Sequence, residues 1–141
     1  MSAESSFDGS ALHLRGGSVD RTVRWAAVER VLFISKHAAL PTEEPDCGWA
    51  VQTADEVILV PPESGILAAL ERAAGDSTEA PAFFSAHYAE SPVSWAALRW
   101  NWKLLKRQVG LFRPRALDTV LARARLSGPM SWTQLKTIEN L

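Results

Sequence analysis

The chain has 141 residues, of which 47% are hydrophobic and 22% charged, and its formal net charge at pH 7 is −1. A chain of this length buries about two-thirds of its unfolded surface around one core, and the composition is unlike that of disordered or fibrous proteins. Neither a signal peptide nor an apolar run of roughly 18 to 20 residues is found, and Cys47 is the only cysteine, so we expect a cytoplasmic protein that is not integral to a membrane.

Charge is distributed unevenly along the chain. Residues 1–92 contain 14 acidic and 6 basic side chains, a net charge of −8, whereas residues 93–141 contain 2 acidic and 9 basic ones, a net charge of +7. The two parts attract each other in the folded chain, or they form separate surface regions that steer partners of opposite charge. The six tryptophans are ambiguous in the same way, because tryptophan is enriched both in cores and at interfaces.

Residues 11–62 are predicted to consist mainly of strands, after a disordered tail at 1–10. Ala11–Arg15 and Val19–Trp25 flank Gly16-Gly17, a pair that can adopt positive φ, so this segment is predicted to form a hairpin. Apolar and polar residues alternate in the second of these strands, as expected when one face of a sheet is buried.

Three further strands are expected before the first helix. Val31-Leu32-Phe33-Ile34 is a continuous apolar run typical of a buried strand, with a helix as the alternative. An acidic loop with two prolines follows at 39–45, and alternation then predicts a strand from Cys47 to Thr53. Val57–Val60 is predicted to be the next strand, and Pro61-Pro62 ends it because proline has no backbone N–H to give to a ladder.

A helix is predicted after these strands, at 63–75. Ile66 and Leu70 lie on one side of this helix, and Gly75 is placed to end it. The next apolar segment, Ala82–Tyr88, is compatible with either a strand or a helix.

Residues 92–141 are predicted to be a helical and basic C-terminal part. A proline at the first helical position favours one helix at 92–109 and another at 114–126. Ser131 and Gln134 have the spacing of a capping box, which predicts a last short helix.

A run of strands followed by a run of helices is typical of an α+β fold with antiparallel pairing, and it argues against an alternating βαβ sheet. No internal repeat divides the chain. We therefore expect a single domain, residues 1–141, in which the N-terminal half forms an antiparallel sheet or a small barrel and helices follow.

No set of residues has the spacing of a catalytic or metal-binding motif. His13, His37 and His87 lie far apart, without the spacing that places two metal ligands on one helix face. Cys47 follows Asp46, whose negative charge disfavours a nucleophilic thiolate. We therefore expect a protein without enzyme activity, metal or cofactor.

Two sets of charged residues are candidate binding surfaces, and each is also compatible with a merely solvated surface. The acidic set flanks the strand around Trp49 and could contact a basic protein partner. The basic set lies on the helix predicted at 92–109, where neighbouring tryptophans could stack on bases while the cations contact phosphates of nucleic acid or of an anionic lipid. The acidic set is Glu43, Glu44, Asp46, Asp55 and Glu56, and the basic set is Arg99, Lys103, Lys106 and Arg107.

The apolar pattern between Val23 and Leu70 resembles that of small bacterial PH-like domains, several of which are similar to immunity proteins of polymorphic toxin systems. The matching residues are Val23-Arg24-Trp25, Val28 and Val31 in a W-x-x-V-x-x-V arrangement, the strand around Trp49, Val57–Pro61, Leu67 and Leu70. These residues cover somewhat under half of the chain. The helical part predicted after Val109 has no counterpart in the family pattern.

The resemblance implies a PH-like barrel in a cytoplasmic protein that binds a cognate toxin and covers its active site or holds it inactive. Two other functions stay open. The basic set could bind phosphate groups of nucleic acid or lipid, or the chain could be an enzyme whose site the sequence does not show.

Overall fold

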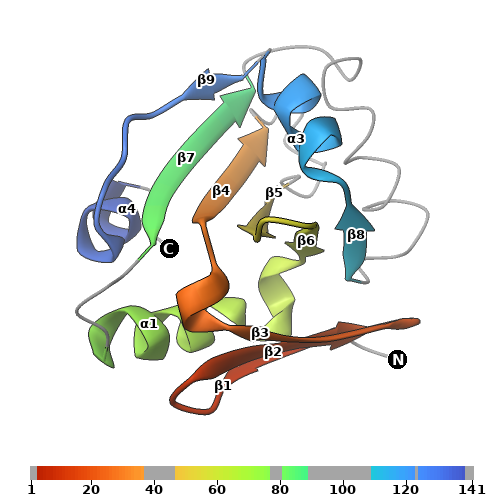
Figure 1. Ribbon diagram of the computed structural model, residues 1–141. Helices are drawn as coiled ribbons and strands as arrows, with labels where there is room; N and C mark the ends of the chain where they lie inside the picture. Colours follow the sequence, from red (N-terminus) through yellow and green to blue (C-terminus); the bar gives the residue numbers. More distant parts are fainter. Residues whose placement is uncertain (1–2, 37–46, 77–80, 89–108, 123, 139–141) are drawn as a thin grey trace.

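In the computed structural model, which describes residues 3–36, 47–76, 81–88, 109–122 and 124–138, the strands form two sheets (Figure 1). The first is an antiparallel three-stranded sheet with the order β1-β2-β3. Its strands are β1 (Glu4–Phe7), β2 (Ala11–Gly16) and β3 (Val19–Arg24). It lies below the second sheet in Figure 1.

The second sheet has six strands in the order β8-β6-β5-β4-β7-β9. β4 and β7 pair parallel, and the other neighbouring strands pair antiparallel. The strands are β4 (Arg30–Lys36), β5 (Cys47–Gln52), β6 (Val57–Val60), β7 (Ala82–Tyr88), β8 (Gly110–Phe112) and β9 (Arg125–Leu126).

Three α-helices in the described residues complete an α+β fold, which confirms the predicted fold class. α1 connects β6 to β7, α3 follows β8, and α4 follows β9. Two short 3-10 turns, η1 and η2, follow β3 and β6. The bounds are α1 (Ile66–Asp76), α3 (Pro114–Leu121), α4 (Trp132–Ile138), η1 (Trp25–Ala27) and η2 (Pro62–Ser64).

The predicted hairpin forms from β2 and β3. Gly16 pairs with Val19, which leaves Gly17 and Ser18 as a two-residue turn. Gly17 has a φ of 62°, in the left-handed region that tight hairpin turns require and that glycine adopts without steric cost. The glycine pair thus fixes the register that places Leu12, Leu14 and Val23 on one face.

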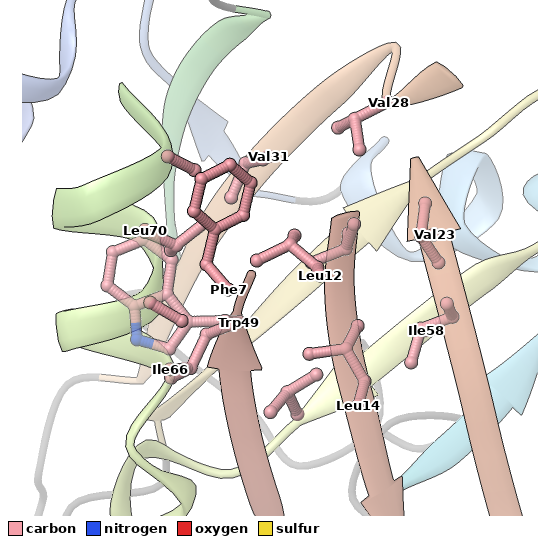
Figure 2. Close-up of a cluster of buried hydrophobic side chains, with 14 of the residues drawn as sticks. Phe7, Leu12, Leu14, Val23, Val28, Val31, Trp49, Ile58, Ile66 and Leu70 are labelled. Atoms are coloured by element: carbon pink, nitrogen blue, oxygen red, sulfur yellow. The ribbon is translucent and has the colours of Figure 1, made fainter. Parts of the chain in front are cut away.

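The main core lies between the inner face of the three-stranded sheet and one face of the six-stranded sheet. Figure 2 shows Leu12 and Leu14 of β2 in one cluster with Trp49 of β5 and Ile58 of β6. α1 closes one side of this core with Ile66 and other apolar residues. The alternation expected for a half-buried strand is therefore a consequence of one sheet packing on another.

A second, smaller core lies on the opposite face of the six-stranded sheet, where α3 covers it with Leu117 and Leu121. Val31 and Phe33 of β4 belong to the main core, whereas Leu32 and Ile34 belong to the second. Both faces of β4 are thus buried, which explains why its sequence is a continuous apolar run and confirms the predicted buried strand.

Six aromatic rings in mutual contact link the N-terminal sheet to the C-terminal helix. The centroid distances between successive rings are 6.3, 6.4, 5.4, 5.8 and 4.9 Å. The rings belong to β1, η1, β7, α4, β5 and β4, so the chain of contacts passes through both sheets. In order, they are Phe7, Trp25, Phe83, Trp132, Trp49 and Phe33, which places the three tryptophans of the described residues in the core.

The N-terminal segment is a correction to the prediction. Glu4–Phe7 form β1, in the region 1–10 that was expected to be a disordered tail. Phe7 is buried against Trp25, and the segment pairs with β2 along its whole length. Because this strand has only one large apolar side chain, its sequence does not display the alternation that identifies a strand.

The segment that follows β6 also differs in detail from the prediction. Gly65, with a φ of 89°, separates η2 from α1, so the helix begins at Ile66 rather than at residue 63. Ala82–Tyr88, for which strand and helix both stayed open, is strand β7. The crossover through α1 brings β7 beside β4 in the same direction, and this pair is the exception to the antiparallel pairing that we expected.

Within 109–122 and 124–138, the C-terminal part is less helical than predicted. The helix that begins at Pro114 ends at Leu121, and Arg125–Leu126 form β9 against β7 instead of continuing it to residue 126. Gly110–Phe112 form β8. Of the helix predicted at 92–109, only Val109 lies within the described residues, and its side chain is buried.

The capping box that precedes α4 is confirmed. The backbone N–H of Ser131 donates to Gln134 Oε1 at 2.9 Å, and the backbone N–H of Gln134 donates to Ser131 Oγ at 3.2 Å. These reciprocal bonds satisfy two N–H groups at the start of the helix. The Trp132 indole N–H donates to Glu71 Oε2 of α1 at 2.5 Å, and this hydrogen bond links α4 to α1.

Packing of the three-stranded sheet on the core predicts a difference between two leucine substitutions. Leu14→Ala in β2 removes a fully buried side chain, so the free energy of unfolding should fall by about 2 to 5 kcal/mol. Leu126→Ala in β9 removes a side chain that is 41% exposed, and its effect should stay within about 0.5 kcal/mol. Urea denaturation measures both, and equal effects would contradict the packing of the two sheets.

Candidate functional site

The outer face of the three-stranded sheet carries a group of polar side chains from all three strands. Because side chains alternate along each strand, the residues that neighbour the buried Phe7, Leu12, Leu14 and Val23 point outward. We call this surface the outer face. It consists of Glu4, Ser6, Asp8, His13, Arg15, Asp20, Thr22 and Arg24.

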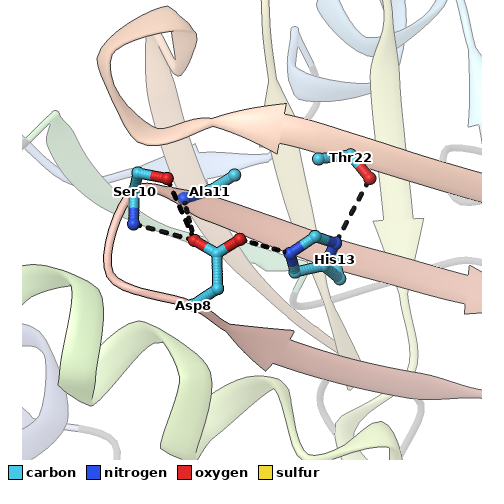
Figure 3. A network of polar contacts seen from close by, with 5 residues as sticks. All are labelled: Asp8, Ser10, Ala11, His13 and Thr22. Atoms are coloured by element: carbon cyan, nitrogen blue, oxygen red, sulfur yellow. Dashed lines mark hydrogen bonds and ion pairs between the residues drawn. The ribbon is translucent and has the colours of Figure 1, made fainter.

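His13 lies at the centre of the outer face, between a carboxylate and a hydroxyl group (Figure 3). Its Nε2 lies 2.7 Å from Asp8 Oδ2, and its Nδ1 lies 3.2 Å from Thr22 Oγ1. A carboxylate only accepts hydrogen bonds, so the neutral ring carries its proton on Nε2 and its Nδ1 accepts from the Thr22 hydroxyl. These contacts fix the orientation of the imidazole ring.

Asp8 is itself held by the turn between β1 and β2. Besides the bond from His13, Asp8 Oδ1 accepts from the backbone N–H groups of Ser10 and Ala11, each at 2.9 Å, and from the Ser10 hydroxyl at 3.1 Å. The hydrogen bond from His13 and then the two backbone N–H groups hold the pKa of the Asp8 carboxyl well below its usual value. Asp8 therefore stays ionised and anchors the network.

A second row of charges crosses the same face two residue pairs away from His13. Arg15 donates from Nε and Nη2 to Glu4 Oε2 at 3.0 and 2.6 Å, and these bonds, together with the negative charge of Glu4, raise the Arg15 pKa. Asp20 lies opposite Arg15 on β3. Negative, positive and negative groups thus follow one another across the three strands.

The outer face is hollowed but open to solvent. A hollow of about 630 Å³ is lined by residues of all three strands, among them Ser6, His13, Arg15 and Thr22. The side chains of His13, which lines the hollow, and of its partner Asp8 are 40% and 48% exposed. A surface of this kind can form directional hydrogen bonds and ion pairs with another polar surface, while water keeps access to every group.

Two of the predicted acidic site residues, Asp55 and Glu56, lie in the turn between β5 and β6, and the structure gives them different roles. Asp55 is exposed, whereas the half-buried Glu56 accepts from Arg21 Nε of β3 at 2.9 Å. Glu56 therefore joins the two sheets, and its carboxylate is committed within the chain. The same bond places the turn that contains the exposed Asp55 next to β3.

The other residues singled out in the sequence are placed only partly. Glu43, Glu44 and Asp46, the basic set Arg99, Lys103, Lys106 and Arg107, and His37 lie outside the described residues. Cys47 and His87 lie on β5 and β7, and both are in register with Ser35 of the strand between them. The structure thus brings Glu56 into contact with Arg21 of β3, and it does not relate this turn to the basic set.

The network around His13 is the part of the site that sequence reasoning missed. In the sequence, His13 lies far from the other histidines, and Asp8 falls in the segment predicted to be a disordered tail. The sequence Asp8-Gly9-Ser10 is typical of a turn in which the aspartate accepts backbone N–H groups. That signal predicts the turn, but the contact with His13 also requires β1 to be recognised as a strand.

Within 3–36, 47–76, 81–88, 109–122 and 124–138, no group of three or more His, Cys, Asp or Glu side chains could hold a metal ion. No helix in these same ranges is long and apolar enough to cross a membrane. Comparison with protein-family models, curated proteins and solved structures gives no match.

The lowered pKa of Asp8 predicts a pH-dependent contribution to stability. A carboxyl group whose pKa is lower in the folded chain than in the unfolded chain stabilises the fold above its unfolded pKa of about 3.9. That contribution is lost as the pH falls through the lowered pKa. Asp8→Asn should therefore destabilise the protein at neutral pH, and the difference from the wild type should shrink as the pH falls below about 4.

Urea denaturation at a series of pH values measures this difference. Asp55→Asn is the matched control, because it removes an exposed turn carboxylate outside the His13 network. A pH-independent difference between Asp8→Asn and the wild type would show that the ionised carboxylate of Asp8 does not stabilise the fold.

Proposed function

We propose that the protein is a non-enzymatic protein-binding module that recognises its partner through the outer face and the neighbouring Asp55 turn. The observation that carries this proposal is the His13 network, in which a solvent-exposed imidazole is held in one orientation by Asp8 and Thr22. Side chains already ordered in the free protein lose less conformational entropy on binding, which favours affinity.

The mixture of charges on the outer face supports recognition of a specific surface. Glu4, Arg15 and Asp20 alternate in sign across the sheet, and such patterns favour partners with the complementary arrangement and disfavour others. The exposure of His13 and Asp8 to water favours this role over catalysis, since reactive centres gain from the exclusion of water.

We propose that the physiological role of this binding is neutralisation of a cognate bacterial toxin, in line with the resemblance to PH-like immunity proteins. The acidic excess of residues 1–92 would accelerate association with a toxin that is basic around its active site. Of the acidic set within the described residues, Asp55 is the residue available for this contact, because Glu56 is paired with Arg21. A cytoplasmic location is part of the same proposal.

Binding to a toxin-like protein encoded directly upstream tests the proposal. The full chain and the toxin-like protein, purified separately, should form a stoichiometric complex on size-exclusion chromatography. In stopped-flow measurements, Asp55→Lys should slow association by on the order of tenfold and weaken its salt dependence. His13→Ala combined with Thr22→Ala should raise the dissociation constant by about tenfold or more, as expected for loss of an ordered contact.

Asp118→Lys is the matched control for Asp55→Lys. Asp118 lies on α3, on the opposite face of the six-stranded sheet, and the charge change is the same. Because Asp118 pairs with Arg30 at 3.2 Å, circular dichroism verifies the fold of this variant. If the outer-face variants bind like the wild type, the proposed contact surface is wrong. Absence of a complex, together with retention of the chain on heparin at physiological salt, would favour the phosphate-binding function instead.

A further inference from the structure

The two edges of the three-stranded sheet differ in how the rest of the chain covers them. At the β1 edge, Ser5 Oγ lies 2.8 Å from Ser64 Oγ, and a Cβ on Gly65 would lie 3.5 Å from the Ser5 carbonyl oxygen. η2 and the start of α1 therefore cover this edge. At the other edge, β3 pairs with β2 alone within the part of the chain that the structure describes.

The register of the sheet identifies the backbone groups that β3 directs to this open edge. Trp25 donates its backbone N–H to the Ser10 carbonyl at 2.9 Å, and hydrogen-bonded pairs alternate along an antiparallel ladder. The N–H and C=O groups of Arg21 and Val23 therefore point toward β2. Those of Asp20, Thr22 and Arg24 point away from it. The Asp20 carbonyl accepts a bond from Arg21 Nη1 at 3.3 Å, and its second lone pair can accept another from a neighbouring strand.

The side chains of these three residues are arranged symmetrically about Thr22. Asp20 and Arg24 lie two residues before and after it, have opposite charges and are exposed on the outer face. Among the described residues, the Arg24 guanidinium has no ion-pair partner. Asp20 lies opposite Arg15, which already pairs with Glu4. The segment from Asp20 to Arg24 is thus complementary in charge to an antiparallel copy of itself.

We propose that β3 pairs antiparallel with β3 of a second copy of this chain, with Thr22 opposite Thr22 at a twofold axis. In this register each outward-facing N–H and C=O group of Asp20, Thr22 and Arg24 meets its counterpart. Asp20 of each copy lies directly opposite Arg24 of the other, which gives two symmetric ion pairs on the outer face. The two sheets join into one continuous sheet.

Other registers lack this match. A pairing centred on Asp20 would place Asp20 against Asp20, and one centred on Arg24 would place like charges together in the same way; like charges directly opposite each other are destabilising. A pairing centred on Arg21 or Val23 keeps backbone bonds but places Asp20 or Arg24 opposite Thr22 of the other copy, so both ion pairs are lost. The pattern therefore favours a second copy with one defined register over an unrelated strand.

This inference does not rest on the proposed function, because it uses the edge of the sheet rather than the centre of the outer face. Sedimentation equilibrium of the full chain should show a concentration-dependent dimer. Asp20→Arg and Arg24→Asp each place like charges opposite each other in the homodimer and should raise its dissociation constant by about tenfold or more, equivalent to about 1.4 kcal/mol.

The decisive measurement mixes the two single variants. Asp20→Arg has arginine at both positions and Arg24→Asp has aspartate at both, so the mixture should form a heterodimer at concentrations where each variant alone is monomeric. The double variant D20R/R24D should regain the homodimer. Asp118→Arg on α3 is the control and should dimerise like the wild type, and circular dichroism verifies the fold of each variant.

Hydrogen exchange of the wild-type chain gives a test that needs no substitution. The amides of Asp20, Thr22 and Arg24 should gain protection as the concentration rises, while those of Arg21 and Val23 are protected throughout by β2. A wild type that stays monomeric at near-millimolar concentration, single variants that dimerise normally, or a mixture that forms no heterodimer would each overturn the proposal.

Discussion

The packing of the three-stranded sheet on the six-stranded sheet is the constraint on which the other features depend. The six contacting aromatic rings from Phe7 to Phe33 hold this interface together and include residues from both ends of the described chain. Trp25 has a central place, because η1 turns the chain there from one sheet to the other. Its indole N–H has no hydrogen-bond partner among the described residues, a cost that the buried ring area offsets.

Elements whose residues are buried in a regular pattern could be predicted from the sequence. The run from Val31 to Ile34 is apolar throughout because β4 is covered on both faces, and Val57–Val60 has the same character for the same reason. The Gly16-Gly17 turn and the Ser131 and Gln134 capping box have local causes that short segments of sequence contain. These features require no knowledge of the rest of the fold.

Elements that depend on distant partners could not be predicted in this way. β1 has one large apolar residue, Phe7, and becomes a strand because β2 supplies the ladder and Trp25 covers the ring. β9 consists of Arg125–Leu126, both exposed, and forms only because β7 offers an edge. The same limit applies to the site: Asp8 and His13 lie in a turn and a strand whose proximity follows from the pairing of β1 with β2.

The apolar inner face and the polar outer face of the three-stranded sheet contribute unequally to the stability of the fold. The interactions of Asp8, Glu4 and Arg15 are exposed, and exposed ion pairs contribute little to stability. Most of the stability therefore comes from the inner face, and the outer face can vary to fit a partner at small cost. In the turn between β5 and β6, a residue held by the fold and an exposed residue are adjacent. Glu56 spans the two sheets through Arg21 and is constrained by the fold, whereas the exposed Asp55 next to it can change without loss of this contact.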